Sequence, residues 1–147
     1  MNIRKGQEKD LEAAFDLVRE LAIYENGEDQ ITTSLDQMRL DGFGDKPVFE
    51  FFVAEHNNRI VGTAIYYFRY STWKGKRLYL EDLIVTESAR GTGLGKALLD
   101  RIVEEAKATQ CSGVMWQVLD WNEPAINFYQ RYGASLDGEW INCHLDI

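Results

Sequence analysis

The stretch that decides the fold is Leu78–Ala108, LYLEDLIVTESARGTGLGKALLDRIVEEAKA. Its first part, Leu78–Val85, is apolar apart from two adjacent carboxylates and favours a strand. A glycine-rich turn follows at residues 90–95. Because glycines let a ligand approach the backbone, and the first N–H groups of a helix lack partners within it, such a turn predicts a phosphate-binding site. The helix after the turn is predicted by apolar residues at helical spacing: Leu94, Leu98, Ile102 and Ala106.

The turn does not match the two commonest phosphate-binding motifs. A P-loop requires GxxxxGK[ST], but here Gly95 and Lys96 are followed by Ala97. The dinucleotide-binding fingerprint GxGxxG fails as well, because Lys96 stands where its third glycine belongs. The motif that remains is Arg-x-x-Gly-x-Gly, which begins at Arg90.

Length, composition and charge restrict the class of protein. A chain of 147 residues with 45% hydrophobic and 27% charged residues predicts one globular domain over residues 1–147. A net charge of −8 disfavours nucleic acid and anionic membranes as partners, and favours a cationic substrate. The chain shows no leader and no membrane-spanning run, so we expect a cytoplasmic protein. The sequence shows no His, Cys and Asp cluster, and we therefore expect no metal.

The order of the expected elements predicts an α/β (α+β) fold. A mixed, mostly antiparallel sheet would carry helices on both faces, in the order β-α-α-β-β-β-α-β-α-β. Three features fix the ends of helices: Ser34 begins a capping-box pattern, Pro124 suits a first helical position, and Gly133 ends a helix. The expected strands cover residues 1–5, 49–55, 60–70, 78–85, 114–120 and 139–145, with the fifth parallel to the fourth, and the expected helices cover residues 10–24, 34–42, 94–108 and 124–132.

This element order, with the Arg90–Gly95 motif, resembles the GCN5-related N-acetyltransferases (GNAT). The resemblance covers nearly the whole chain. Three segments are similar to the diamine (spermidine/spermine) and thialysine N-acetyltransferases within that family: Tyr24-Glu25, Leu78–Asp82, and Trp121–Tyr129 with the sequence WNEPAINFY.

The resemblance implies that acetyl-CoA is the acetyl donor. Its pyrophosphate would lie on the glycine turn and its pantetheine arm along the strand before it, where a backbone N–H near Leu83 would polarise the thioester carbonyl. The residues implied in cofactor binding are Leu83, Ile84, Val85, Arg90, Gly91, Thr92, Gly93, Leu94, Gly95, Lys96, Asn122, Glu123, Pro124 and Ala125.

Acetyl transfer to an amine requires a deprotonated amine and a proton for the leaving thiolate. Because primary amines have a pKa near 10, a carboxylate must receive their proton, and Glu81 is the candidate. Asp82 would point to the opposite face in a regular strand, but the resemblance implies a β-bulge that brings both carboxylates toward the site. Tyr129 is similar to the family's general acid. Each residue also has a structural alternative. One of the two carboxylates would only pair with a basic side chain, and Tyr129 would only pack in the core.

We expect the acceptor to be the primary amine of a small cationic molecule, either a diamine or polyamine or a thialysine-like amino acid. Tyr24, Glu25, Glu81 and Asp82 would bind it. Because little positive charge is expected near these residues apart from the cofactor turn, the sequence favours diamines and polyamines over amino acids. Two alternatives stay open: acetylation of a protein or peptide amine, and a catalytically silent acyl-CoA-binding regulatory module.

An aromatic-rich strand predicts the oligomeric state. Tyr66–Tyr70 contains four aromatic residues, and Trp73 follows in the next loop. This is more aromatic surface than one sheet face requires, so together with the family resemblance it predicts a homodimer with each acceptor site near the interface.

Overall fold

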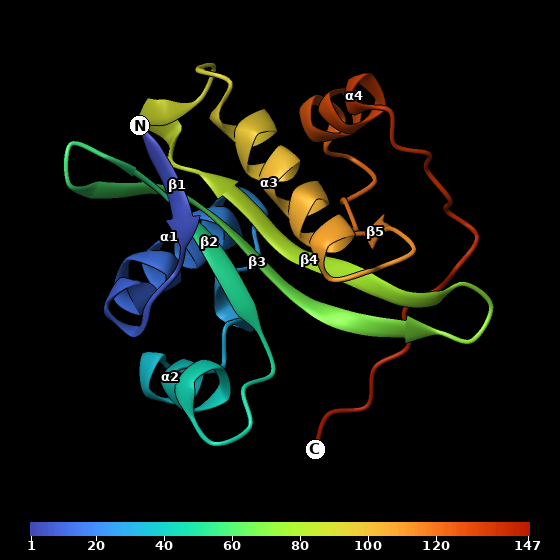
Figure 1. Ribbon diagram of the computed structural model, residues 1–147, viewed down its shortest axis with the longest axis horizontal. Helices are drawn as coiled ribbons and strands as arrows, with labels where there is room; N and C mark the ends of the chain where they lie inside the picture. The colour runs from blue at the N-terminus through green and yellow to red at the C-terminus, as the bar shows by residue number, and fades with distance from the viewer. The chain divides into compact units, whose positions relative to one another are not determined.

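The computed structural model describes residues 1–147, which form two compact units (Figure 1). The first unit is Met1–Trp116 and contains the whole sheet. The second unit is Gln117–Ile147 and contains one helix.

The first unit is built on a five-stranded sheet in the order β1-β2-β3-β4-β5. The first four strands pair antiparallel, and β5 runs parallel to β4, as its place after a helix predicted. The sheet is therefore mixed and mostly antiparallel, which confirms the predicted class. The strands are β1 (Asn2–Lys5), β2 (Glu50–His56), β3 (Arg59–Ser71), β4 (Gly75–Val85) and β5 (Val114–Met115).

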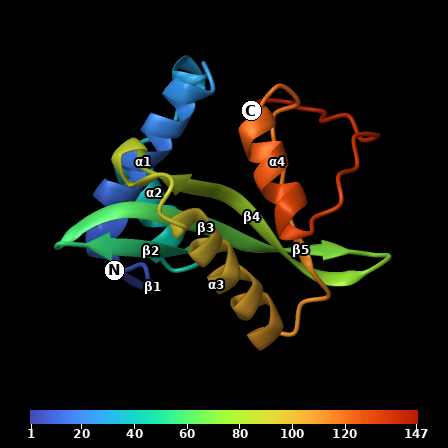
Figure 2. The same cartoon turned by 90° about the horizontal axis from the view of Figure 1, so that it is seen from above.

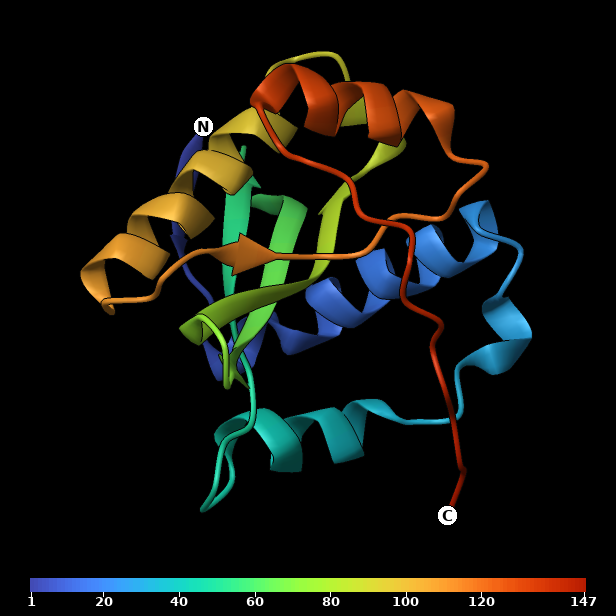
Figure 3. The ribbon, with the colours of Figure 1, turned by 90° about the vertical axis from the view of Figure 1, so that its right-hand side faces the viewer.

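Three α-helices of the first unit cover this sheet on both faces. Figures 2 and 3 show α1 on one face and α3 on the other. The capping box predicted α2 correctly, since the Ser34 hydroxyl accepts a hydrogen bond of 3.1 Å from the Gln37 backbone N–H. The helices are α1 (Leu11–Tyr24), α2 (Leu35–Phe43) and α3 (Leu94–Ala108), with short 3-10 turns η1 (Glu8–Asp10), η2 (Glu28–Gln30) and η3 (Glu87–Ala89).

The alternation of side chains along β2 gives each face of the sheet its own core. Phe51 and Val53 pack with Leu11 of α1. Phe52, the residue between them, lies under the guanidinium of Arg101 of α3, 4.6 Å from its ring centre. Because successive strand residues point to opposite faces, one strand anchors helices on both sides.

A β-bulge interrupts the pairing of β3 with β4. Ile65 pairs with Asp82, but its neighbour Tyr66 pairs with Leu80, so Glu81 is an extra residue on β4. The pairing of β4 with β5 also stops short of this point, after Tyr79↔Met115. The predicted strand over residues 114–120 is therefore only two residues long, because a bulge changes the twist of a strand and a straight neighbour cannot follow it.

The second unit contains α4 (Glu123–Tyr132). Its first turn is capped by the Asn122 side chain, which accepts a hydrogen bond from the Ala125 N–H, and Pro124 lies in that turn. Gly133 ends the helix with a φ of 106°. Both helix-boundary predictions are thus confirmed to within one residue.

The closing strand predicted over residues 139–145 does not form. Residues 133–147 lie outside any helix or strand, and Trp140 and Leu145 are 77% and 89% exposed. A strand is stable only with a neighbour to receive its backbone hydrogen bonds, and the second unit contains no other strand. No helix of the chain combines the length and apolar character needed to cross a bilayer.

Candidate functional site

The predicted phosphate-binding turn joins β4 to α3. Gly91 and Gly93 have φ values of 77° and 82°, which side chains rarely adopt, and Gly93 is the N-cap of α3. No side chain caps this helix. A Cβ added at either glycine would meet no atom within 4 Å. The turn therefore requires glycine for its backbone conformation, and it leaves open space over a helix N-terminus.

Glu20 of α1 fixes the start of this turn. Its carboxylate accepts a 3.0 Å hydrogen bond from the Thr86 hydroxyl and one of 2.9 Å from the Glu87 N–H. No motif in the sequence marks Glu20 as a site residue. The one available signal was its position four residues before Tyr24, which places both side chains on the same side of α1.

Arg90, the first residue of the motif, contacts the protein itself. Its Nε donates to the Val85 carbonyl at 3.1 Å, and an Nη lies 3.9 Å from the Glu20 carboxylate. Its guanidinium also lies 5.6 Å from the ring centre of Tyr24. These contacts brace the turn against α1 and leave the anion-binding character of the turn to its backbone.

The unpaired edge of β4 lies directly before the turn. Thr86 N–H donates to the Val61 carbonyl, so the backbone of Thr86 points toward β3. Because backbone groups alternate in direction along a strand, those of Leu83 and Val85 point to the edge that β5 does not reach. Leu83 was the predicted donor to a thioester carbonyl, and its N–H direction agrees with that prediction.

Three carboxylates gather beside the bulge. In a regular strand Glu81 and Asp82 would point to opposite faces, but the extra residue lets both reach the α1 face, where Ile65, the partner of Asp82, packs against Leu11. The predicted bulge is thus confirmed. Burial, together with the charges of Glu81 and Glu25, raises the pKa of Asp82 to about 7. Burial also raises the pKa of Glu25, which lies at the C-terminus of α1.

Two tyrosines continue this face of the sheet. The Tyr67 hydroxyl donates to the Glu81 carboxylate at 3.2 Å, and its ring centre lies 5.2 Å from that of Tyr79. Burial and the charge of Glu81 raise the pKa of Tyr67 to about 12 and raise that of Tyr79. Both phenols therefore stay protonated near neutral pH. From the sequence, Tyr67 was expected only as one of the aromatic residues of a dimer surface.

The other predicted site residues belong to the second unit. Tyr129 is half-buried on α4, with its ring edge-on to Phe128 at 5.3 Å between centres. The buried Asn122 side chain caps α4. Glu123, Pro124 and Ala125 form the first turn of that helix.

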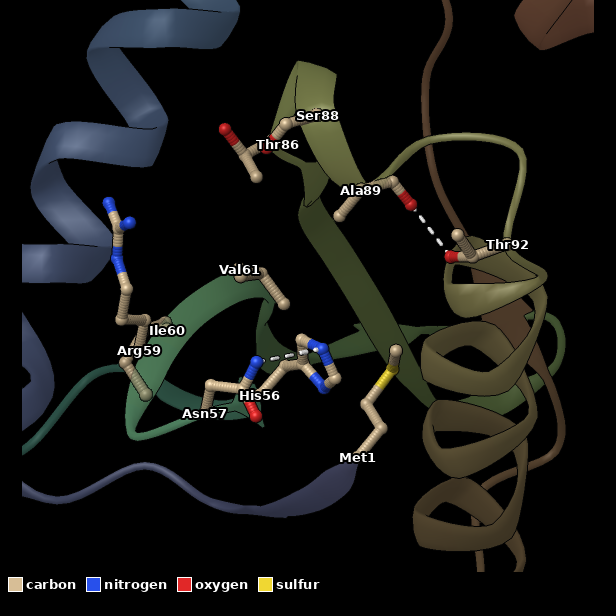
Figure 4. A pocket seen from close by; sticks show the side chains of 10 residues that line it. All are labelled: Met1, His56, Asn57, Arg59, Ile60, Val61, Thr86, Ser88, Ala89 and Thr92. Carbon is tan, nitrogen blue, oxygen red and sulfur yellow. Dashed lines mark hydrogen bonds between the residues drawn. The ribbon is translucent and has the colours of Figure 1, made fainter.

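A hollow of about 360 Å³ lies on the β3 side of the turn (Figure 4). One side of the hollow is lined by residues at the turn, namely Thr86, Ser88, Ala89 and Thr92. Figure 4 shows His56 opposite them. None of the three gathered carboxylates lines this hollow, so it is not the place where a cationic acceptor would be held. No group of three or more His, Cys, Asp or Glu side chains is placed to hold a metal ion.

The comparisons with known proteins give the family. The model of the acetyltransferase (GNAT) family matches residues 11–134 and extends across both units. The chain belongs to this family. The predicted resemblance is thereby confirmed, and N-acetyltransferase is the class of enzyme that its named relatives share.

Two relatives and one solved structure show how close the likeness is. A thialysine N-epsilon-acetyltransferase from Bos taurus is 40% identical over 140 residues, which is 90% of this chain and 82% of that protein. A human spermidine/spermine N(1)-acetyltransferase-like protein 1 is 39% identical over 90% of this chain and 20% of its own length. A structure described as a predicted acetyltransferase with acetyl-CoA, from Clostridium acetobutylicum, has a TM-score of 0.76 at 24% identity, covers 97% of this chain and 95% of its own, and supports the fold.

Proposed function

We propose that residues 1–147 form one acetyltransferase domain that transfers the acetyl group of acetyl-CoA to the primary amine of a small cationic molecule. The acceptor class is a diamine or polyamine, or a thialysine-like amino acid. The observation that supports this most directly is the group of three carboxylates, Glu25, Glu81 and Asp82, beside the strand that leads into the glycine turn. The names of two relatives agree with a small amine as the acceptor. One is a thialysine N-epsilon-acetyltransferase, and the other is a spermidine/spermine N(1)-acetyltransferase-like protein 1.

The donor site consists of the turn and the unpaired edge of β4. Backbone N–H groups at the start of α3, with the positive end of its dipole, would receive the pyrophosphate. The edge groups of Leu83 and Val85 would pair with an extended pantetheine arm, as an added strand does. Arg90 would act by bracing the turn, since its guanidinium already contacts Val85 and Glu20.

The acceptor site consists of the carboxylates at the bulge. Glu25 and Glu81 would attract the ammonium form of the amine, and Asp82 would take its proton. A base works best when its pKa lies near the working pH, and a pKa of about 7 gives Asp82 this property. Glu81 was the base expected from the sequence; in the structure it accepts the Tyr67 hydrogen bond, which suits it to hold the substrate.

The reaction would then be direct. Once Asp82 has taken a proton from the ammonium group, the neutral amine nitrogen attacks the thioester carbonyl carbon and the carbon–sulfur bond breaks. The second proton, which the nitrogen loses as the amide forms, replaces the one that Tyr129 gives to the thiolate. The leaving thiolate takes a proton from Tyr129, whose phenol has the right chemistry for a thiol-like leaving group. Neither a metal nor an acyl-enzyme intermediate is required.

The deciding experiment is CoA release with a panel of acceptors under saturating acetyl-CoA. We expect turnover with small diamines, polyamines or amino acids that carry a second amine, and little with lysine-containing peptides. Preference for peptides would favour the protein-acetyltransferase alternative. Acetyl-CoA binding without turnover on any amine would favour a silent regulatory module.

We also propose that the chain forms a homodimer through the β3–β4 hairpin. Tyr70 and Trp73 at the end of this hairpin are 73% and 88% exposed, and Phe68 is half-exposed on the same strand. Exposed aromatic clusters of this kind are typical of protein–protein contacts.

A further inference from the structure

Two arginines lie opposite each other on the acceptor face of the sheet. Arg69 of β3 pairs with Arg77 of β4, two residues beyond the pair formed by Tyr67 and Tyr79. Because side chains two residues apart on a strand share a face, both arginines lie on the face that carries the two tyrosines. The sequence expectation of little positive charge near the acceptor residues is therefore wrong. Pairing across the hairpin, which brings Arg77 beside Arg69, is decided by the fold.

Neither arginine forms an ion pair with a carboxylate of the chain. Arg69 donates to the Met115 sulfur at 3.2 Å and lies 5.6 Å from the ring centre of Tyr79. Arg77 packs against the backbone of Gly113, where an added Cβ would lie 2.5 Å from one of its nitrogens. Like charges directly opposite on neighbouring strands destabilise a sheet. An anion bound between them would remove this cost.

Both arginines lie on the same hairpin as the carboxylates at the bulge, beyond the pair formed by Tyr67 and Tyr79. The Glu81 carboxylate is hydrogen-bonded to Tyr67, and Arg69 is two residues from Tyr67, about 7 Å along the strand. The charges of Glu81 and Arg69 act in opposite directions on the pKa of both Tyr67 and Tyr79. The face is therefore negative at one end and positive at the other, with two neutral phenols between.

We propose that Arg69, assisted by Arg77, binds the carboxylate of an amino acid whose side-chain amine lies at Glu81 and Asp82. The site would then prefer amino acids with a terminal side-chain amine over diamines of the same chain length. This inference rests on the proposed acetyltransferase function, and it reverses the preference for diamines that the sequence suggested.

Matched acceptors test this directly, because ornithine differs from putrescine, and lysine from cadaverine, only by the carboxylate. For the wild-type chain we expect a higher kcat/KM with ornithine or lysine than with the matched diamine. Arg69→Gln should lower kcat/KM for the amino acids about 10- to 100-fold, the usual range for a charged hydrogen bond. The loss should be chiefly in KM, and the diamine values should stay unchanged or rise. Arg77→Gln should have the same direction and a smaller size.

Lys74→Gln supplies the control, since it removes the same charge from an exposed position on the same hairpin. It should leave the ratio of amino acid to diamine unchanged. Equal losses for both acceptors in Arg69→Gln, or a wild-type preference for the diamines, would overturn the inference while leaving the acetyltransferase function intact. Loss of the dimer in Arg69→Gln with an unchanged acceptor ratio would assign the arginines to a second copy of the chain and overturn it too. No acetylation of any amine would instead reject the proposed function.

Discussion

At the scale of single residues, Asp82 shows how the backbone places a carboxylate where its charged form is disfavoured. The bulge at Glu81 turns Asp82 into the same face as two other acids, where burial raises its pKa most and the repulsion of the two acids adds to the effect. The protein thus holds an acid that is half-protonated near neutral pH. A buried acid of this kind lowers the free energy of unfolding when it is ionised. Active sites commonly contain such groups.

Asp82→Asn should therefore stabilise the protein at alkaline pH. The pKa of Asp82 is about 7 in the folded chain, against 3.8 for an unperturbed aspartate. Between these values the folded state binds more protons than the unfolded state, so the wild-type loses stability as pH rises from about 4 to 7. Asparagine has no such dependence. The free energy of unfolding of the variant, relative to wild-type, should rise by about 2 kcal/mol between pH 5 and 8, as measured by urea denaturation. A difference that does not change with pH would show that Asp82 has an ordinary pKa.

The same substitution should reduce activity. If Asp82 is the base, wild-type kcat rises as pH increases through about 7, and Asp82→Asn loses both this rise and most of the rate. Glu81→Gln is the comparison: it should weaken amine binding and keep the pH-dependent rise, shifted to lower pH because the charge of Glu81 raises the pKa of Asp82. If the rise of kcat with pH disappears in Glu81→Gln and remains in Asp82→Asn, Glu81 is the base.

Tyr129→Phe keeps the aromatic ring beside Phe128 and removes only the hydroxyl. If the phenol protonates the thiolate, turnover should fall by about 10²- to 10⁴-fold, with acetyl-CoA affinity little changed. Tyr132→Phe, on the same helix, is the matched control and should retain turnover. Similar activity in both variants would make Tyr129 a packing residue.

At the scale of elements, the turn into α3 depends on glycine for two different reasons. Gly93 is needed for its positive φ, so a side chain there would strain the turn whether or not a ligand binds. Gly95 lies inside the helix and has no positive φ. It is therefore the position at which ligand binding can be tested with the least cost to the fold.

Gly95→Asp separates binding from stability. A carboxylate in the first turn of a helix is favourable by about 0.3–1 kcal/mol, so the fold should be maintained. The same charge should repel the pyrophosphate and reduce acetyl-CoA affinity at least tenfold, measured by calorimetry. Ser34→Asp adds the same charge at the N-cap of α2 and should leave acetyl-CoA affinity unchanged. Normal affinity in Gly95→Asp would show that the cofactor does not lie on this turn.

At the scale of the whole molecule, the exposed aromatic residues predict self-association. Sedimentation at micromolar concentration should give the mass of two chains for the wild-type, and Tyr70→Ser combined with Trp73→Ser should shift it toward one. Both positions are exposed, so the fold should tolerate the change. Leu40→Ser, at another exposed apolar residue, should keep the wild-type mass. A monomeric wild-type would remove the basis for a site near a dimer interface.

Features that depend on short-range chemistry could be predicted from the sequence. The glycine turn, the caps of α2 and α4, the antiparallel hairpins and the parallel β5 all follow from local residue types and connection lengths. The family also follows from sequence, since its motifs are contiguous. The site residues predicted from the sequence lie within such motifs, and their roles stay predictions.

Contacts between distant groups depend on how the elements pack. The bulge at Glu81 was expected from the family resemblance, but the register across the β3–β4 ladder brought Tyr67 to Glu81 and set Arg69 opposite Arg77, and neither contact has a local signal. Glu20 reached the turn because α1 packs across the sheet from far earlier in the chain. The segment 139–145 shows the converse, because its pattern is that of a strand, yet a strand exists only where another backbone receives its hydrogen bonds.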